Sequence, residues 1–241
     1  MMPDFSNLVL EWLKNNSLVK KRPDMVFYPS ELGSKCIRKL FYNQFLSKPI
    51  DDTSLMVFES GNVIHKWVGD FLRWCSDKKI INLVELEKPF TYVVRAYDLD
   101  VEIHGRIDSI IECEGKKYVW ESKSVKSFFK RDGDGFIEYP LPLDAHIIQV
   151  HPYMRAMRLK NALIFYVDKT NFKVKWYNII YSKTVMGEIE NKIRSVISCA
   201  LSLNLPQRIL NYPNSWECDY CPYKTECMND YIPDINLVNE W

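Results

Sequence analysis

The chain has 241 residues, of which 47% are hydrophobic and 14% aromatic, so it can bury a full core within one large domain. Its formal net charge is only +1, which excludes a protein that attracts nucleic acid through an overall basic field. Charged residues interrupt the apolar residues of the first 16 positions, which fits neither a signal peptide nor a membrane span. We therefore expect a cytoplasmic protein with no membrane partner.

The apolar periodicity predicts a mixed α/β (α+β) fold. Helices are expected over 4–20, 34–46 and 53–76, then strands over 83–97, 101–113 and 117–123, a helix over 144–160, strands over 162–168 and 172–181, and a helix over 184–203. Segment 125–143 and the tail after 203 are rich in glycine, proline or asparagine, which predicts irregular structure. We interpret 1–241 as a single domain with a helical part (1–80), a core (81–182) and a C-terminal helix with a tail (183–241).

The two strands over 101–113 and 117–123 predict a β-hairpin closed by Glu114-Gly115. If Cys113 faces Lys116, the numbers of paired residues sum to 229, and Asp108 then lies opposite Glu121. Strand side chains repeat with a period of two, so Lys123 projects from the same face as Glu121.

Like charges that face each other in a sheet are destabilising, so this pair of carboxylates needs a reason. Asp and Glu oxygens bind a hard divalent cation such as magnesium or manganese, and a nearby lysine can hold a water molecule or a developing negative charge. The alternative is a solvated hairpin face on which Glu121 and Lys123 form an ordinary ion pair. The hairpin by itself leaves both interpretations open.

Three of the seven cysteines, Cys218, Cys221 and Cys227, form a C-x2-C-x5-C pattern that can wrap thiolates around one metal. A fourth ligand would come from Cys36, Cys75, Cys113 or Cys199. Cys36 stands out because it begins a predicted helix, where the helix dipole favours a thiolate. Four thiolates suit zinc or a [4Fe-4S] cluster, and the ligands alone do not choose between them. Three reduced cysteines without a metal are the remaining alternative.

Five motifs occur in an order that resembles a known family. HGRIDS with the downstream ESK resembles the G-x-x-D and E-x-K motifs of PD-(D/E)XK nucleases. GNVIH ends in a histidine typical of the RecB-like branch, and QVHPY has the Q-x-x-x-Y spacing. The four cysteines resemble the iron-sulfur set of AddB and of the CRISPR-associated RecB-like exonuclease family (Cas-four). The motifs run from residue 36 to residue 227, nearly the whole chain.

The resemblance implies a restriction-endonuclease-like core in which a central mixed sheet is flanked by helices. It also implies a role for each motif residue: metal ligands His65, Asp108, Glu121 and the Ser122 carbonyl; Lys123 for the attacking water; Gln149 and Tyr153 on the phosphate backbone; cluster ligands Cys36, Cys218, Cys221 and Cys227. Imidazole in the ligand set makes Mn²⁺ at least as suitable as Mg²⁺. Pro152 departs from the family pattern, and we expect it to kink the helix between Gln149 and Tyr153.

By the same resemblance, the expected activity is exonucleolytic hydrolysis of single-stranded DNA in CRISPR adaptation or DNA repair. CRISPR integrase proteins are then expected partners, and the chain could form an oligomer. Aromatic side chains in 125–143 would stack on bases, and basic side chains would contact phosphates. These residues are Phe128, Phe129 and Tyr139, and Lys116, Lys117, Lys123, Lys126, Lys130 and Arg131. The alternatives are a non-cutting DNA-binding scaffold, a zinc-binding regulator, and a mobile-element nuclease of the same fold.

Overall fold

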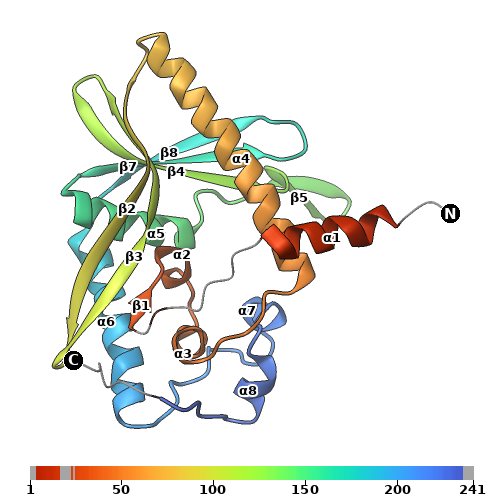
Figure 1. The fold of residues 1–241 in the computed structure, drawn as a ribbon, viewed down its shortest axis with the longest axis vertical. Helices are drawn as coiled ribbons and strands as arrows, with labels where there is room; N and C mark the ends of the chain where they lie inside the picture. The colour runs from red at the N-terminus through yellow and green to blue at the C-terminus, as the bar shows by residue number, and fades with distance from the viewer. Residues whose placement is uncertain (1–3, 17–22, 24, 236–241) are drawn as a thin grey trace.

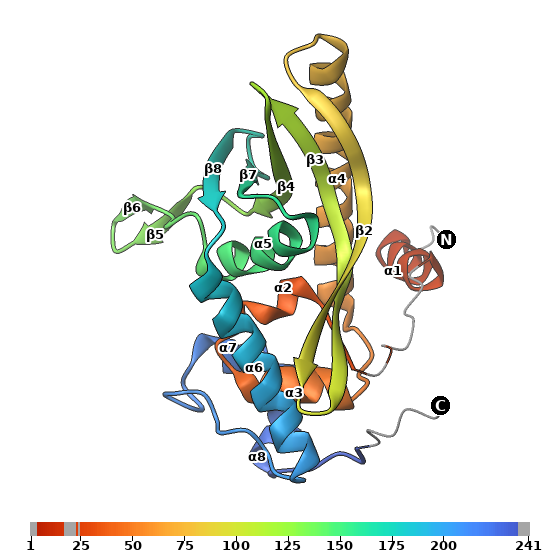
Figure 2. The same ribbon diagram turned by 90° about the vertical axis from the view of Figure 1, so that its left-hand side faces the viewer.

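A curved six-stranded sheet separates two helical layers (Figures 1 and 2). The structure is a computed structural model and describes residues 4–16, 23 and 25–235. Helix α4 crosses one face of the sheet, whereas α5 and α6 cover the other. Helices α3, α7 and α8 gather at the end of the molecule opposite the tip of α4 (Figure 1).

The sheet mixes parallel and antiparallel pairs. Its strands are β1 (Val26–Phe27), β2 (Asn82–Ala96), β3 (Leu99–Cys113), β4 (Lys116–Val125), β7 (Asn161–Asp168) and β8 (Val174–Ile180). They follow the order β1-β3-β4-β7-β8, and β2 pairs with β3 along its length. Strands β4 and β7 are parallel, so the chain crosses back through α5 between them. The expected mixed α/β fold with a central mixed sheet is confirmed.

The helices are α1 (Phe5–Asn16), α2 (Pro29–Leu32), α3 (Ile37–Phe45), α4 (Asp52–Asp77), α5 (Asp144–Met157), α6 (Lys183–Leu201), α7 (Trp216–Asp219) and α8 (Lys224–Met228). Helix α4 begins where the Asp51 carboxylate accepts a hydrogen bond from the Ser54 N–H. Its residues Ile64, Val68 and Leu72 recur every fourth position and are buried against the sheet. None of the helices in the described ranges is long and apolar enough to cross a bilayer.

The predicted hairpin register is confirmed. Cys113 pairs with Lys116, and the ladder continues to Ser109 opposite Trp120, so every pair sums to 229. Glu114 and Gly115 form the turn with φ angles of 51° and 71°. Positive φ at both central positions matches the right-handed twist of the two strands.

Segment 125–143 differs from the prediction of irregular structure. Strands β5 (Phe129–Asp132) and β6 (Gly135–Glu138) form a separate two-stranded sheet that projects beside the main one (Figure 2). Gly133 supplies a φ of 58° at the turn between them. The composition suggested a loop because DGDG marks a turn, and the short strands flanking it carry no alternating pattern.

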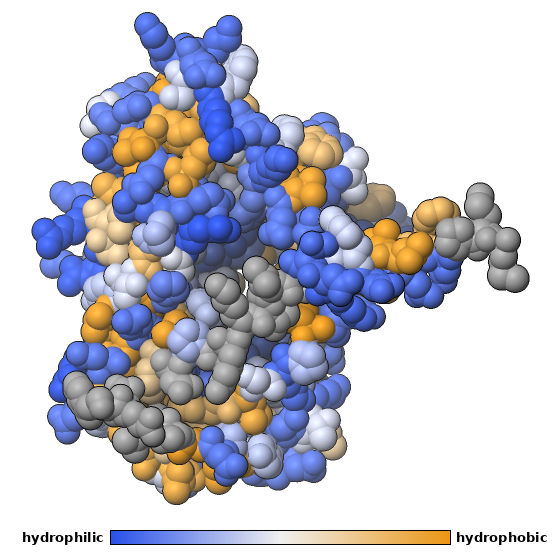
Figure 3. All heavy atoms as spheres, in the orientation of Figure 1, coloured by the Kyte–Doolittle hydropathy of each residue, from blue (hydrophilic) through white to orange (hydrophobic). Residues whose placement is uncertain are grey.

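Other differences are small. The prediction missed β1 and α2, and the irregular tail contains the short helices α7 and α8. Of the first predicted helix, residues 17–20 lie outside the described residues. Helix α1 projects from the body of the molecule, and most of its apolar side chains are exposed to solvent (Figure 3). The rest of the molecular face drawn in Figure 3 is largely hydrophilic, with separate apolar patches.

Gly33 sets the distance between α2 and the start of α5. A Cβ atom at this position would lie 2.5 Å from the Ala145 Cα, closer than real Cβ contacts. The absence of a side chain therefore lets the segment before Cys36 pack directly on the first turn of α5.

Candidate active site and cysteine pocket

The two predicted carboxylates lie where strands β3 and β4 part. The ladder ends one pair short of Asp108 and Glu121, and β4 goes on to pair with β7. The Ser122 N–H donates to Asp108 Oδ2 at 2.7 Å, so this carboxylate replaces the backbone of β3 as acceptor. Asp108 and Glu121 therefore do not form the direct cross-strand pair predicted from the sequence, because β3 and β4 diverge at this point.

Glu121 is 1% exposed, and among the described residues only one of its two carboxylate oxygens has a polar partner. Lys123 Nζ and Gln149 Nε2 each lie 2.7 Å from Glu121 Oε1. The second oxygen, Oε2, is buried and has no hydrogen-bond partner among the described residues. A buried, unsatisfied carboxylate oxygen costs free energy unless a cation or a donor meets it.

His65 reaches the acidic pair from α4, on the other layer. Its Nδ1 lies 3.5 Å from Asp108 Oδ1. Burial lowers the pKa of His65, although the charge of Glu121 and a hydrogen bond to the Ser122 backbone raise it. The imidazole is therefore kept neutral, which is the form that binds a metal.

Burial raises the pKa of Asp108 well above its usual range, and the charge of Glu121 raises it further. The Ser122 N–H and Lys123 oppose this shift without cancelling it. The surroundings of Asp108 thus disfavour its charged form, and an added cation would stabilise that form.

The donor set suits a hard divalent cation, with two carboxylates, one neutral imidazole and the unsatisfied Glu121 Oε2. In the part of the chain that the structure describes, no three His, Cys, Asp or Glu side chains are gathered as a preformed metal site. Asp108 turns one oxygen to Ser122 instead, and Glu121 turns one to Lys123 and Gln149.

Gln149 and Tyr153 lie on α5, next to Glu121. Both are buried, at 5% and 3% exposed. Gln149 Nε2 donates to Glu121 and, at 3.0 Å, to the Tyr153 hydroxyl. Gln149 thus links the Tyr153 hydroxyl to the Glu121 carboxylate. Pro152 lies inside α5, which runs unbroken from Asp144 to Met157, so Gln149 and Tyr153 lie on the same helix.

The sequence analysis missed two residues next to this site. The Tyr166 hydroxyl lies 2.8 Å from His146 Nδ1, and Tyr166 is the strand partner of Lys123. His146 precedes Gln149 by three residues, so the two share one face of α5. That spacing was the available signal, but the pairing of Tyr166 with Lys123 depends on tertiary structure.

We expect Asp108→Asn to stabilise the metal-free protein at pH 8. A group whose pKa is raised on folding contributes stability while protonated and loses it as the pH rises through the folded-state pKa. Asparagine keeps an acceptor for Ser122 without the charge. In EDTA, the melting temperature should rise by about 2–4 °C, the shift that 1 kcal/mol produces in a domain of this size.

This gain should shrink as the pH falls and Asp108 becomes protonated. Asp98→Asn, at an exposed position in the turn between β2 and β3, is the matched control and should change nothing. An equal melting temperature for Asp108→Asn and wild type at pH 8 would contradict the raised pKa.

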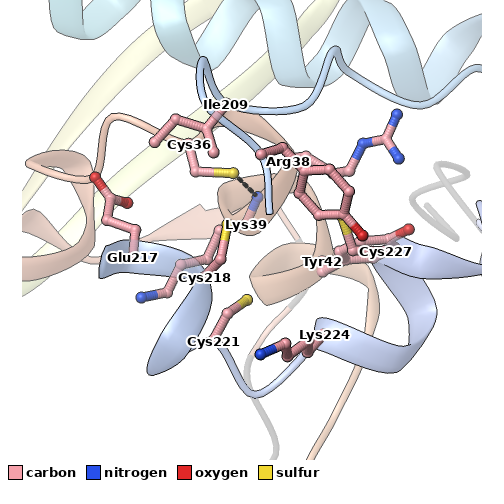
Figure 4. A pocket seen from close by; sticks show the side chains of 11 residues that line it. Cys36, Arg38, Lys39, Tyr42, Ile209, Glu217, Cys218, Cys221, Lys224 and Cys227 are labelled. Carbon is pink, nitrogen blue, oxygen red and sulfur yellow. Dashed lines mark hydrogen bonds between the residues drawn. The ribbon is translucent and has the colours of Figure 1, made fainter. Parts of the chain in front are cut away.

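The four predicted cluster cysteines line one pocket. Cys36 is the N-cap of α3, Cys218 lies in α7, Cys227 in α8, and Cys221 between these two helices. Figure 4 shows their side chains directed into a common space. Residues from the two ends of the chain are therefore adjacent, as expected. Cys75, Cys113 and Cys199 do not line this pocket.

Direct hydrogen bonds also join the tail to the Cys36 segment. Glu217 accepts from the Ser34 hydroxyl at 2.6 Å and from the Lys35 N–H at 2.9 Å. Arg38 donates to the Pro206 carbonyl at 2.6 Å and to Asp230 at 2.5 Å. The fold at this end thus has polar contacts that do not involve the thiols.

Burial raises the pKa of Cys36, Cys218 and Cys221. The charges of neighbouring cysteines add to the shift in each case. Hydrogen bonds oppose it, such as that from the Lys39 N–H to Cys36 Sγ at 3.4 Å. The four thiols that line this pocket would ionise together only if a cation compensated their charge. Within the described residues they are not gathered as a preformed metal site.

A mixed sheet with an aspartate where two strands part, and Glu-x-Lys on the next strand, defines an α/β domain of the nuclease type. Residues 28–228 match the PD-(D/E)XK nuclease superfamily, and the chain belongs to that superfamily. The crystal structure of SSO0001 shares the fold, with a TM-score of 0.62 and 19% identity over 92% of this chain and 95% of that one.

A second structure, named "Putative exonuclease" from Eubacterium rectale, has a TM-score of 0.37 and 13% identity over 95% of this chain and 82% of that one. That similarity is too low to support an argument. No curated protein sequence matches the chain.

Proposed function

We propose that this protein is a metal-dependent exonuclease that hydrolyses phosphodiester bonds in single-stranded DNA. The observation that carries the proposal is the buried Glu121 Oε2, which has no hydrogen-bond partner among the described residues, in a nuclease-superfamily fold. Burial and the neighbouring Glu121 charge raise the pKa of Asp108, so an added cation would stabilise its charged form.

His65, Asp108, Glu121 and the Ser122 carbonyl would hold Mn²⁺ or Mg²⁺. Such an ion, when bound, polarises the phosphate and lowers the pKa of an attacking water molecule. Lys123 provides positive charge at the reacting centre, where negative charge develops. Gln149 keeps the Glu121 carboxylate in place through its hydrogen bond to Oε1, and the Tyr153 hydroxyl accepts a hydrogen bond from the same Gln149 amide.

Exposed aromatic and basic side chains on the β5–β6 hairpin support a single-stranded substrate. Phe129 and Phe136 are 56% and 76% exposed, and Lys130 and Arg131 are exposed beside them. Phe128 is not available for stacking, contrary to the sequence-based expectation, because it is 2% exposed and lies under Lys175. Aromatic stacking combined with phosphate contacts binds single strands without reading their sequence.

We further propose that the cysteine pocket holds a [4Fe-4S] cluster, with zinc as the alternative. Cys36 and the tail cysteines would be its ligands, and its role would be to fasten the tail. The resemblance to the Cas-four family supports CRISPR adaptation or DNA repair as the context, with integrase proteins as partners.

The test is to incubate the purified protein with end-labelled single-stranded and double-stranded DNA in Mn²⁺, Mg²⁺ or EDTA. We expect progressive shortening of the single strand with either metal and none in EDTA. Intact single strands under every metal condition would refute the proposed function.

Replacing both Phe129 and Phe136 with alanine should weaken single-strand binding. Stacking contributes about 1–3 kcal/mol per base, so the Kd should rise by about 10-fold or more. Fluorescence anisotropy with a labelled oligonucleotide in Ca²⁺ measures this. Tyr97→Ala, also exposed but in the distant β2–β3 turn, is the control. An unchanged Kd for the double variant would exclude the hairpin as a binding surface.

A further inference from the structure

His146 lies on the same side of α5 as Gln149 and bonds to the strand partner of Lys123. Gln149, on α5, bonds to Glu121, on β4. One turn earlier on α5 and one same-face step further on β4, His146 lies close enough to Lys123 for its charge to act on the imidazole. Tyr166, the partner of Lys123 on β7, bonds to His146. The imidazole is therefore held by β7 beside the strand that carries Glu121 and Lys123.

The hydrogen bonds of Tyr166 select one tautomer of His146. Tyr166 is fully buried, and its hydroxyl accepts from the Leu143 N–H at 3.1 Å. Its own proton must then go to the other neighbour, His146 Nδ1, at 2.8 Å. A neutral imidazole that accepts at Nδ1 carries its proton on Nε2. The hydrogen-bond network thus makes Nε2–H a donor.

The surroundings keep this imidazole neutral. Burial and the nearby charge of Lys123 lower the pKa of His146 to about 3. Within the described residues, Nε2 forms no hydrogen bond to protein, and the side chain is only partly buried. A fixed donor with no protein acceptor, close to a lysine that faces the acidic pair, is suited to an anionic oxygen.

We infer that His146 Nε2–H donates a hydrogen bond to a non-bridging oxygen of the phosphodiester that is cleaved, and that Tyr166 fixes the required tautomer. The inference rests on the proposed nuclease function and adds a phosphate-contacting residue to it. A donor aimed at the charge that develops on the phosphate lowers the barrier more than it strengthens substrate binding.

The test compares His146→Ala with His146→Gln in the Mn²⁺ assay on single strands. The alanine variant should lose about 10- to 100-fold in kcat with little change in KM, the range for a hydrogen bond to a charged group. Glutamine offers an N–H donor and should restore most of that loss. Manganese affinity, measured by calorimetry, should stay unchanged in both variants. His104→Ala, on an exposed part of β3, is the control.

Tyr166→Phe tests the tautomer. It should reduce kcat in the wild-type background and have no further effect in His146→Gln, because an amide has no tautomer to fix. If wild type cuts and His146→Ala cuts equally well, the inference is wrong while the nuclease function stands. If glutamine fails to rescue although both variants melt like wild type, a donor role is also wrong. If wild type does not cut, the proposed function itself fails.

Discussion

Glu121→Gln is expected to reduce metal-dependent hydrolysis of single-stranded DNA by about a thousandfold or more, because it removes the charge that would hold the cation at the reacting centre. The amide matches the carboxylate in shape, so Gln149 and the buried surroundings of residue 121 can persist. Asp108→Asn should have a comparable effect. Lys123→Ala should lose about 100-fold, since it removes positive charge and leaves the cation ligands intact.

Initial rates on an end-labelled oligonucleotide in Mn²⁺ measure these losses, and calorimetry with Mn²⁺ separates ligand loss from charge loss. Binding should disappear in Glu121→Gln and persist in Lys123→Ala. Glu112→Gln is the matched control, since Glu112 lies on the same hairpin opposite Lys117 and outside the site. Undiminished cutting by Glu121→Gln would remove these residues from the mechanism.

Protein purified without oxygen is expected to be brown and to contain about four iron atoms per chain. Cys36→Ser should bleach the protein and bring the iron below one atom per chain, because in the proposed cluster Cys36 would supply the ligand from the N-terminal part of the sequence. The melting temperature should fall by about 10 °C or more, as expected for the loss of several kcal/mol of metal binding.

The hydrogen bonds of Glu217 and Arg38 to the opposite segment should still hold part of the tail in place. We therefore expect Cys36→Ser to stay folded, with the tail more open to proteolysis. Cys113→Ser, at the β3–β4 turn and outside the pocket, is the control for thiol loss. Colourless protein with one zinc per chain would replace the iron-sulfur proposal with the zinc alternative, and protein without any metal would contradict both.

Several features follow from local sequence alone. The register of the β3–β4 hairpin could be predicted because Glu114 and Gly115 suit a turn with two positive φ angles, and a two-residue turn sets every later pair. Helix α4 was predictable because one face repeats apolar residues at helical spacing. The cysteine spacing pointed to a shared site, since too little chain separates Cys218 from Cys227 for an independent core.

Tertiary structure decided how these pieces act together. Periodicity assigns a side chain to a face, but it does not say where two strands part, and this parting turns Asp108 toward the Ser122 N–H. Gln149 donates to Glu121 and to the Tyr153 hydroxyl because α5 packs over β4, a contact between segments that lie far apart in sequence. The same packing sets His146 beside Tyr166. Local propensity acts over a few residues, whereas the surroundings of a buried charge depend on which distant segments the core brings together.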